Sequence, residues 1–478
     1  MKEWARKGVL GLMLLLSACG GGGGSTSGSG TGGGTIGGGG GGTTSDQCSL
    51  RNRQVWSQGV LNEWYLFPET LPATLDPAPY STVSDYIDAL TATARGQRRD
   101  RFFTYLTSIA QENAFFSSGS SAGFGFRVSS EATTRRVFIS EAFEGTVALA
   151  AGIDRGDEVL AIGTTPTTLR TVTDIIAAEG TAGVTDAFGP TTAGTTRTLR
   201  LTGPSGLRTL TLTKADYSLM PVSARYGVKV IDDGTRKIAY LNLRTFISTA
   251  DGQLRTAFAQ FRTAGITDYI VDFRYNGGGL VSTAELMGDL LGGNRFSSDV
   301  FSLTTYRAEK ASNNSTKRFN VQSQSVSPLR IAFIGTGATA SASELVINSF
   351  IPYYGSRLAL IGTNTFGKPV GQVAIDRAAC DDRLRVVAFS TRNSANSDAY
   401  FDGLKTAVTA SCQATDDLTK PLGDPAEAST KAALDFLAGR TCVPIPIVGQ
   451  SSQSATPRRE LLTPLMPDTT QREVPGAF

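Results

Sequence analysis

The stretch YIVDFRYNGGG, residues 269–279, places a short apolar run directly before three glycines. Such a run is typical of a strand buried on both faces, and the glycines favour a tight turn at its end. RIAFIG, residues 330–335, and RLALI, residues 357–361, predict two further strands, and helix-like segments cover residues 252–264 and 283–291. Alternation of strands and helices predicts an α/β domain over residues 220–442.

Small and polar residues follow each of these strands. Ser341 and Ser343 come after the second strand, where an apolar helix is expected to begin, and Lys368 comes after the third. Because the carboxyl ends of parallel strands meet at one edge of a sheet, we expect these loops to share a crevice. Free N–H groups at a helix N-terminus favour negative charge on a nucleophile. A glycine N–H from residues 277–279 could pair with the N–H of Ala342 to hold an oxyanion.

The 478 residues include no histidine. This excludes Ser-His-Asp and Cys-His catalysis and His-ligated metal sites, so neither a metal nor a cofactor is predicted. A serine hydrolase would then need another base, and lysine can serve if its pKa falls well below about 10.4. Lys368 stands between Gly367 and Pro369, and no acidic residue occurs between Glu344 and Asp376. It is therefore the candidate base.

The charge balance argues against nucleic acid as a partner. Lys and Arg number 45 and Asp and Glu 42, a net charge of +3. No basic excess is available to neutralise phosphates.

The N-terminus predicts export. Lys2, Arg6 and Lys7 precede an apolar run over residues 8–16, which is too short to span a bilayer, and LSAC ends at Cys19. This pattern resembles the bacterial lipobox, in which the cysteine is lipidated. We therefore expect a signal peptide over residues 1–18, lipidation of Cys19 and a Gly-rich flexible tether over residues 19–45. The protein would be an exported bacterial lipoprotein, anchored to a membrane and facing the periplasm or the cell surface; the alternative is an ordinary signal peptide with a chance cysteine.

Two further regions are assigned from composition and periodicity. Residues 46–118 carry apolar residues at helical spacing and predict a helical N-terminal domain. Residues 443–478 begin with a Pro- and Ser-rich stretch and predict a flexible C-terminal tail.

Four cysteines remain in the exported chain: Cys48, Cys380, Cys412 and Cys442. An even number in an oxidising compartment predicts two disulfides, with three possible pairings. We favour Cys380–Cys412 and Cys48–Cys442.

Residues 119–214 read as short strands and turns. Gly123-Phe124-Gly125-Phe126 opens a β run, and AGIDRGDEVLAI follows over residues 151–162. Together they resemble a PDZ domain, in which the N–H groups of such a loop bind the end of a peptide and the adjacent strand edge adds it as a strand. Residues 123–126 would then hold a substrate tail. The alternative is a small β-domain without a ligand.

Three motifs resemble the C-terminal processing (tail-specific) serine peptidases, a Ser-Lys family: DFRYNGG at 272–278, TASASE at 339–344 and TFGKPVGQ at 365–372. The resemblance implies a multidomain α/β protein with a helical N-terminal region, a PDZ-like domain and a crotonase-like Ser-Lys peptidase domain. It implies Ser341 as nucleophile, Lys368 as base and Gln372 as the residue that orients the lysine. Ala342 and Gly278 are the expected oxyanion donors. Asp272 and Arg274 are expected to brace the glycine turn.

The resemblance implies endoproteolysis of proteins or peptides with apolar C-termini, and leaves the oligomeric state open. The main alternative is a non-catalytic surface lipoprotein that binds peptides or apolar ligands. A penicillin-recognising hydrolase would need S-x-x-K, and no lysine in the chain has a serine three residues before it.

Overall fold

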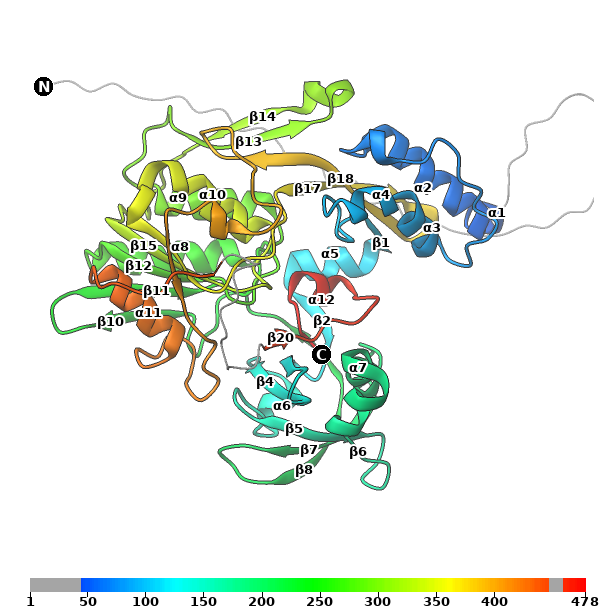
Figure 1. Cartoon of the computed structure of the whole chain (residues 1–478), viewed down its shortest axis with the longest axis horizontal. Helices are drawn as coiled ribbons and strands as arrows, with labels where there is room; N and C mark the ends of the chain where they lie inside the picture. Colours follow the sequence, from blue (N-terminus) through cyan, green and yellow to red (C-terminus); the bar gives the residue numbers. More distant parts are fainter. Residues whose placement is uncertain (1–43, 447–458) are drawn as a thin grey trace, which may run out of the picture. The chain divides into compact units, whose positions relative to one another are not determined.

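The structure, a computed structural model, describes residues 44–446 and 459–478 (Figure 1). The predicted signal peptide, Cys19 and nearly all of the predicted tether lie outside the described residues. Within the described part of the chain, no helix combines the length and the apolar character needed to cross a membrane.

Residues 44–118, the helical module, are mainly helical. Side chains of Ser49 and Thr82 accept backbone N–H groups and so fix two helix starts. The apolar faces of these helices share a core with strands β17 and β18, which follow Lys368 in the chain. The elements are α1 (Thr44–Gln47), α2 (Leu50–Trp64), η1 (Pro68–Thr70), α3 (Val83–Leu90), α4 (Ala92–Gly96), β1 (Tyr105–Ser108) and α5 (Ile109–Ser118).

Residues 119–218, the β-rich module, form a sheet in the order β20-β3-β4-β5-β7-β8, with β6 on β5 and a separate β2-β9 pair. Their core is built around buried Phe124, Phe126 and Phe188. The elements are β2 (Ser120–Gly123), β3 (Phe126–Glu131), β4 (Arg136–Ala142), α6 (Val147–Ala150), β5 (Glu158–Gly163), β6 (Arg170–Thr171), α7 (Val172–Phe188), β7 (Thr196–Thr202), β8 (Arg208–Thr213) and β9 (Ala215–Ser218).

The α/β module contains a sheet in the order β10-β11-β12-β15-β16-β19, parallel from β11 to β19. Figure 1 shows α8, α9 and α10 on one face and α11 on the other, and two separate apolar cores match these faces. Cover on both faces explains why residues 269–271, 331–334 and 358–361, in the central strands, are all apolar. The strands are β10 (Val228–Asp232), β11 (Lys237–Asn242), β12 (Asp268–Asp272), β15 (Arg330–Gly335), β16 (Leu358–Gly362) and β19 (Ala410–Gln413); the helices are α8 (Ala250–Thr263), α9 (Val281–Leu291), α10 (Ala342–Tyr354), η3 (Gly355–Arg357) and α11 (Ala428–Leu437).

A second sheet adjoins the α/β module, in the order β1-β18-β13-β14 with β17 on β18. It joins β1 of the helical module to the long strands after Lys368. Its further elements are β13 (Val300–Tyr306), η2 (Ala308–Asn313), β14 (Ser315–Arg318), β17 (Val370–Arg377), η4 (Ala378–Cys380) and β18 (Asp382–Arg392), and η5 (Leu404–Thr406) follows.

The predicted flexible tail over residues 443–478 is wrong for its last part. Residues 459–478, here called the C-terminal segment, contain β20 (Glu460–Leu461) and α12 (Thr469–Glu473). Leu462, Val474 and Phe478 are buried. The prediction followed the Pro- and Ser-rich composition and overlooked these apolar residues, whose burial offsets the entropy of ordering the segment.

The favoured disulfide pairing is also wrong. The structure pairs Cys48 with Cys380 and Cys412 with Cys442. Cys48 lies beside the β17–β18 hairpin because Arg377 donates hydrogen bonds to the backbone of Gln47 and Asn52. The contact of the helical module with this hairpin brings together cysteines 332 residues apart, which sequence distance does not predict.

Candidate active site

Three loops meet at the carboxyl edge of the parallel sheet. The Gly277–Gly279 turn follows β12, Ser341 follows β15 and Lys368 follows β16. Parallel register places Asp272 beside Ile334 and Gly335 beside Gly362, so the loops leave the sheet side by side. The expected shared crevice is therefore present.

Ser341 has a strained backbone. Its φ is 55° and its ψ is −115°, a left-handed conformation that residues with a side chain rarely adopt. Ala340 N–H and Ser343 Oγ both donate to the carbonyl of Asn276, at 3.1 Å each, and hold the turn in place. Strain of this kind costs about 1–3 kcal/mol and is concentrated at functional sites.

The glycine turn closes against Ser341. A methyl group on Gly278 would lie 2.7 Å from Ser341 Cβ and 3.2 Å from the nitrogen of Ala342, so glycine alone fits. The N–H of Ala342, at the first turn of α10, has no hydrogen-bond acceptor among residues 44–446 and 459–478. It is therefore free to bind an oxyanion.

The expected second oxyanion donor is already engaged. The N–H of Gly278 donates to Asn276 Oδ1 at 2.9 Å, and the N–H of Gly277 donates to the carbonyl of Glu473 at 3.3 Å. Within the described residues, the N–H of Gly279 has no acceptor. Gly278 could serve as a donor only after Asn276 releases it.

Lys368 lies among aromatic and polar groups. Its Nζ donates to Gln372 Oε1 at 3.0 Å and lies 5.0 Å from the ring centroid of Phe103. Gln372 Nε2 donates to the carbonyl of Phe103, which fixes the amide. Burial lowers the pKa of the Lys368 ammonium, opposed by the nearby carboxylates of Glu473 and Asp100. A lowered pKa is what a lysine base requires.

Glu344 joins the two halves of the site. Its buried carboxylate accepts the N–H of Ser341 at 3.1 Å and the N–H groups of Gly367 and Lys368 at 2.7 Å each. Burial raises the pKa of Glu344 to about 6, although these hydrogen bonds favour the charged form. One carboxylate thus holds the serine turn and the lysine loop together.

Ser341 and Lys368 are brought to the same place without direct contact. In the described part of the chain, no hydrogen bond joins Ser341 Oγ to Lys368 Nζ, and the lysine is held by Gln372 instead. Apo geometry of this kind is common, since catalytic hydrogen bonds often tighten only with substrate bound.

Asp272 and Arg274 act as braces, as expected. Arg274 is fully buried and pairs with Asp272, Asp416 and Glu427. These ion pairs fix the backbone that leads into the glycine turn.

Sequence reasoning gave no role to Glu344 or Arg101. Glu344 stands three residues after Ser341 at a helix start, the spacing of a capping box, so the signal was present. Arg101 of the helical module donates to the carbonyls of Phe366 and Gly367 at 2.6 and 2.5 Å, and no local pattern indicates that contact.

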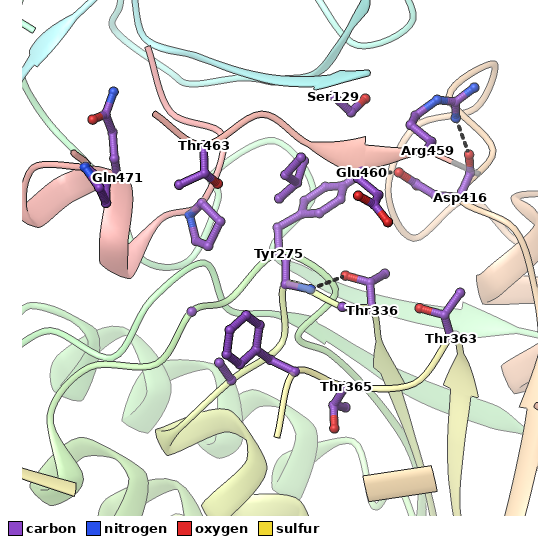
Figure 2. A pocket seen from close by; sticks show the side chains of 18 of the residues that line it. Ser129, Tyr275, Thr336, Thr363, Thr365, Asp416, Arg459, Glu460, Thr463 and Gln471 are labelled. Carbon is purple, nitrogen blue, oxygen red and sulfur yellow. Dashed lines mark hydrogen bonds between the residues drawn. The ribbon is translucent and has the colours of Figure 1, made fainter. Parts of the chain in front are cut away.

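A cavity of about 2040 Å³ opens beside the site. Its lining includes Ala340, Lys368 and Gly277, and it extends to Ser129 and Glu158 of the β-rich module. Figure 2 shows Thr336, Thr363 and Thr365 at the strand ends and, across the cavity, Glu460, Thr463 and Gln471 of the C-terminal segment. The C-terminal segment is therefore one wall of the space that leads to the lysine.

Comparison with a solved structure defines the class of fold. A candidate S41 protease from Bacteroides fragilis superposes with a TM-score of 0.61 at 22% identity, over 80% of this chain and 97% of that chain. The two chains share a fold.

Sequence comparison points to the family. Residues 237–401 match the model of Peptidase family S41. A carboxyl-terminal-processing peptidase 3 from the Arabidopsis thaliana chloroplast is 27% identical over 56% of this chain and 49% of its own length. A carboxyl-terminal-processing protease from Synechocystis is 25% identical over 52% and 53%. The chain spans about half the length of these curated relatives, and the similarity to Peptidase family S41 lies in residues 237–401.

Proposed function

We propose that this chain is a serine endopeptidase that cleaves proteins near apolar C-terminal tails, with Ser341 as nucleophile, Lys368 as base and Gln372 as the residue that orients the lysine. The family match and the names of the curated relatives support a processing peptidase. The lipid anchor on Cys19 remains part of the proposal and rests on the N-terminal motif.

The observation that carries the proposal is the carboxylate of Glu344. It fixes the backbone of Ser341 and of Lys368 from a single point, although 26 residues separate them in the chain. A serine at a helix mouth with a strained backbone and a buried lysine with a lowered pKa are the two parts that a Ser-Lys mechanism needs.

The mechanism follows from these positions. Neutral Lys368 Nζ takes the proton of Ser341 Oγ as this oxygen attacks the scissile carbonyl carbon. The N–H of Ala342, with one glycine N–H from the 277–279 turn, binds the oxyanion. When the intermediate collapses, the C–N bond breaks and the lysine gives its proton to the leaving amine. Water, deprotonated by the same amine, then hydrolyses the acyl-enzyme.

The β-rich module would hold the substrate tail. A substrate tail would bind at the Gly123–Phe126 loop and pair with the edge of β3, the positions that residues 460–461 and 476–478 of the chain itself occupy in this structure. PDZ-like binding of the tail at these positions would give the enzyme its preference for apolar C-termini.

The test is cleavage of β-casein by the full chain and four variants. Ser341→Ala and Lys368→Ala are expected to lose at least about 10³-fold in kcat. The matched controls Ser205→Ala and Lys237→Ala, at exposed positions, should cleave like the wild type. Undiminished cleavage by either site variant would refute the assignment. Tail binding without turnover in every chain would favour the non-catalytic lipoprotein.

A further inference from the structure

The C-terminal segment occupies the strand edge expected to bind substrate. Residues 476–478 run antiparallel to β3, where Ala477 pairs with Arg127. Val128 N–H donates to the carbonyl of Gly476 at 2.8 Å, and Phe478 N–H donates to the carbonyl of Phe126 at 3.0 Å. Earlier in the segment, β20 pairs with Ser129 and Ser130 of the same strand. The segment therefore adds to the sheet as a peptide ligand would.

The glycine loop is closed around Phe478. Gly125 N–H donates to the backbone oxygen of Phe478 at 3.0 Å. A methyl group on Gly123 would lie 2.8 Å from the carbonyl carbon of Phe478, so a larger residue at 123 would collide with the segment. Three of the four residues predicted to bind a substrate tail, Gly123, Gly125 and Phe126, thus lie against residue 478 of their own chain.

The Phe478 side chain fills an aromatic pocket. It is 2% exposed and belongs to the same core as Phe124 and Phe126. Its ring centroid lies 4.9 Å from that of Phe188, the last residue of α7. Figure 1 shows this end of the chain beside α7. The pocket lies between β3 and α7 and is matched to an aromatic side chain that follows two small residues, Gly476 and Ala477.

The same segment reaches the catalytic edge. The carbonyl of Glu473 accepts the N–H of Gly277 at 3.3 Å. A methyl group on Gly277 would lie 2.7 Å from the carbonyl oxygen of Arg472 and 3.1 Å from Pro475 Cδ. Residues 472–475 are thus packed against the turn that should receive the scissile bond.

The C-terminal segment also contributes charged groups that face Lys368. Glu473, which the segment supplies, and Asp100, from the helical module, favour the protonated amine. Arg385 of β18 and Arg472 of the segment oppose them. The docked segment thus places one carboxylate, Glu473, and one guanidinium, Arg472, among the charged groups around Lys368.

We propose that residues 472–478 are a tethered ligand of the β3–α7 groove that keeps the active site closed, and that substrates open it by presenting an aromatic tail preceded by small residues. This rests on the proposed peptidase function. A tethered ligand acts at a high effective concentration, so an external tail must compete with it. Substrates with an apolar, aromatic end would both displace the segment and uncover the glycine turn.

The first test measures groove occupancy without turnover. A fluorescein-labelled peptide of residues 472–478, REVPGAF, is titrated into full-length Ser341→Ala protein and followed by fluorescence anisotropy. Adding Phe478→Asp should tighten peptide binding by about tenfold or more, since the internal competitor is weakened. The matched control is Phe296→Asp, because Phe296 is 76% exposed and distant in sequence from the groove. Equal affinity in all three proteins would overturn the proposal.

A second variant tests the proposal without relying on correct folding of the Phe478→Asp protein. A chain that stops at Glu473 lacks residues 474–478, which include the part that pairs with β3, and introduces no aspartate at the position of the Phe478 ring. Its thermal midpoint should rise on addition of REVPGAF, whereas that of the full chain should not. A shortened chain that ignores the peptide, whether folded or unfolded, would show that residues 474–478 are ordinary core and not a ligand.

The third measurement separates this inference from the peptidase function. With Ser341 intact, Phe478→Asp should cleave β-casein several-fold faster than the wild type and Phe296→Asp, by about fivefold or more. Equal cleavage by all three proteins would refute the role of residues 472–478 as a tethered ligand but would remain consistent with the proposed peptidase function. Peptide displacement without cleavage in any chain would refute the peptidase and leave the tethered ligand standing.

Discussion

Replacing Glu344 by Gln would remove the charge that holds the two halves of the site. The carboxylate accepts one N–H on Oε1, from Gly367, and two on Oε2, from Ser341 and Lys368. A glutamine can keep its side-chain oxygen toward the N–H groups of Ser341 and Lys368, but its NH₂ group then faces the N–H of Gly367. A hydrogen bond to a charged group contributes about 1.5–3 kcal/mol, and an unpaired buried donor costs about 1–3 kcal/mol.

The loss is offset in part because burying the charge is itself unfavourable. Burial raises the pKa of Glu344 from 4.5 to about 6, which corresponds to about 2 kcal/mol at neutral pH. We therefore expect Glu344→Gln to lower the free energy of unfolding at pH 7 by about 0.5–4 kcal/mol. The kcat should nevertheless fall about 10- to 100-fold, because a displacement near 1 Å at the serine or lysine is enough.

The pH dependence of stability tests whether Glu344 is the carboxyl with the raised pKa. A carboxyl whose pKa is higher in the folded than in the unfolded protein binds protons more readily when folded. Its contribution to stability is therefore fully present below pH 4.5 and is lost as pH rises through about 6. Urea unfolding at both ends of this window should show that difference in the wild type and not in Glu344→Gln.

The assay for this prediction is steady-state cleavage of β-casein, with Glu309→Gln as matched control because Glu309 is exposed on η2. A folded Glu344→Gln protein with kcat within about twofold of the wild type would refute the positioning role of this carboxylate. An unchanged pH dependence of unfolding would refute the assignment of the raised pKa.

Three further predictions concern the neighbouring residues. Burial lowers the pKa of Lys368. If the neutral amine is the base, as proposed, kcat should rise with pH through that pKa; a pH profile that falls over this range contradicts the mechanism. Gln372→Ala should lower kcat about tenfold with little change in KM, because the amide accepts a hydrogen bond from Lys368 Nζ and is proposed to orient it. Steady-state kinetics test this, and a change confined to KM would be inconsistent with that role. Gly278→Ala should lower kcat by about 10²-fold, because the added methyl group would collide with Ser341 Cβ. Gly337→Ala is the control, since Gly337 has open space around it and kcat should not change. Equal rates in the two variants would disprove the close contact.

The three loops of the candidate site could be predicted to meet because each one directly follows a buried strand. Each of the three buried strands is a short apolar run, and each is followed at once by the loop that carries Gly278, Ser341 or Lys368. Parallel pairing then brings the loops together without further information.

The remaining features depend on contacts between distant segments. Cys48 reaches Cys380 through the packing of the helical module on β17–β18, and Phe478 pairs with Phe126, which lies 352 residues earlier in the chain. Neither contact leaves a periodic pattern in the sequence. The engaged N–H of Gly278 depends on the side-chain direction of Asn276, which residue spacing alone does not fix.

The most direct measurement is chemical labelling of the nucleophile. The wild type and Phe478→Asp would be treated with a fluorophosphonate probe, digested and mapped by mass spectrometry. We expect one adduct, on Ser341, formed faster in Phe478→Asp and abolished by Lys368→Ala. An adduct on another serine, or labelling of Ser341 at an unchanged rate without Lys368, would contradict the Ser-Lys pair.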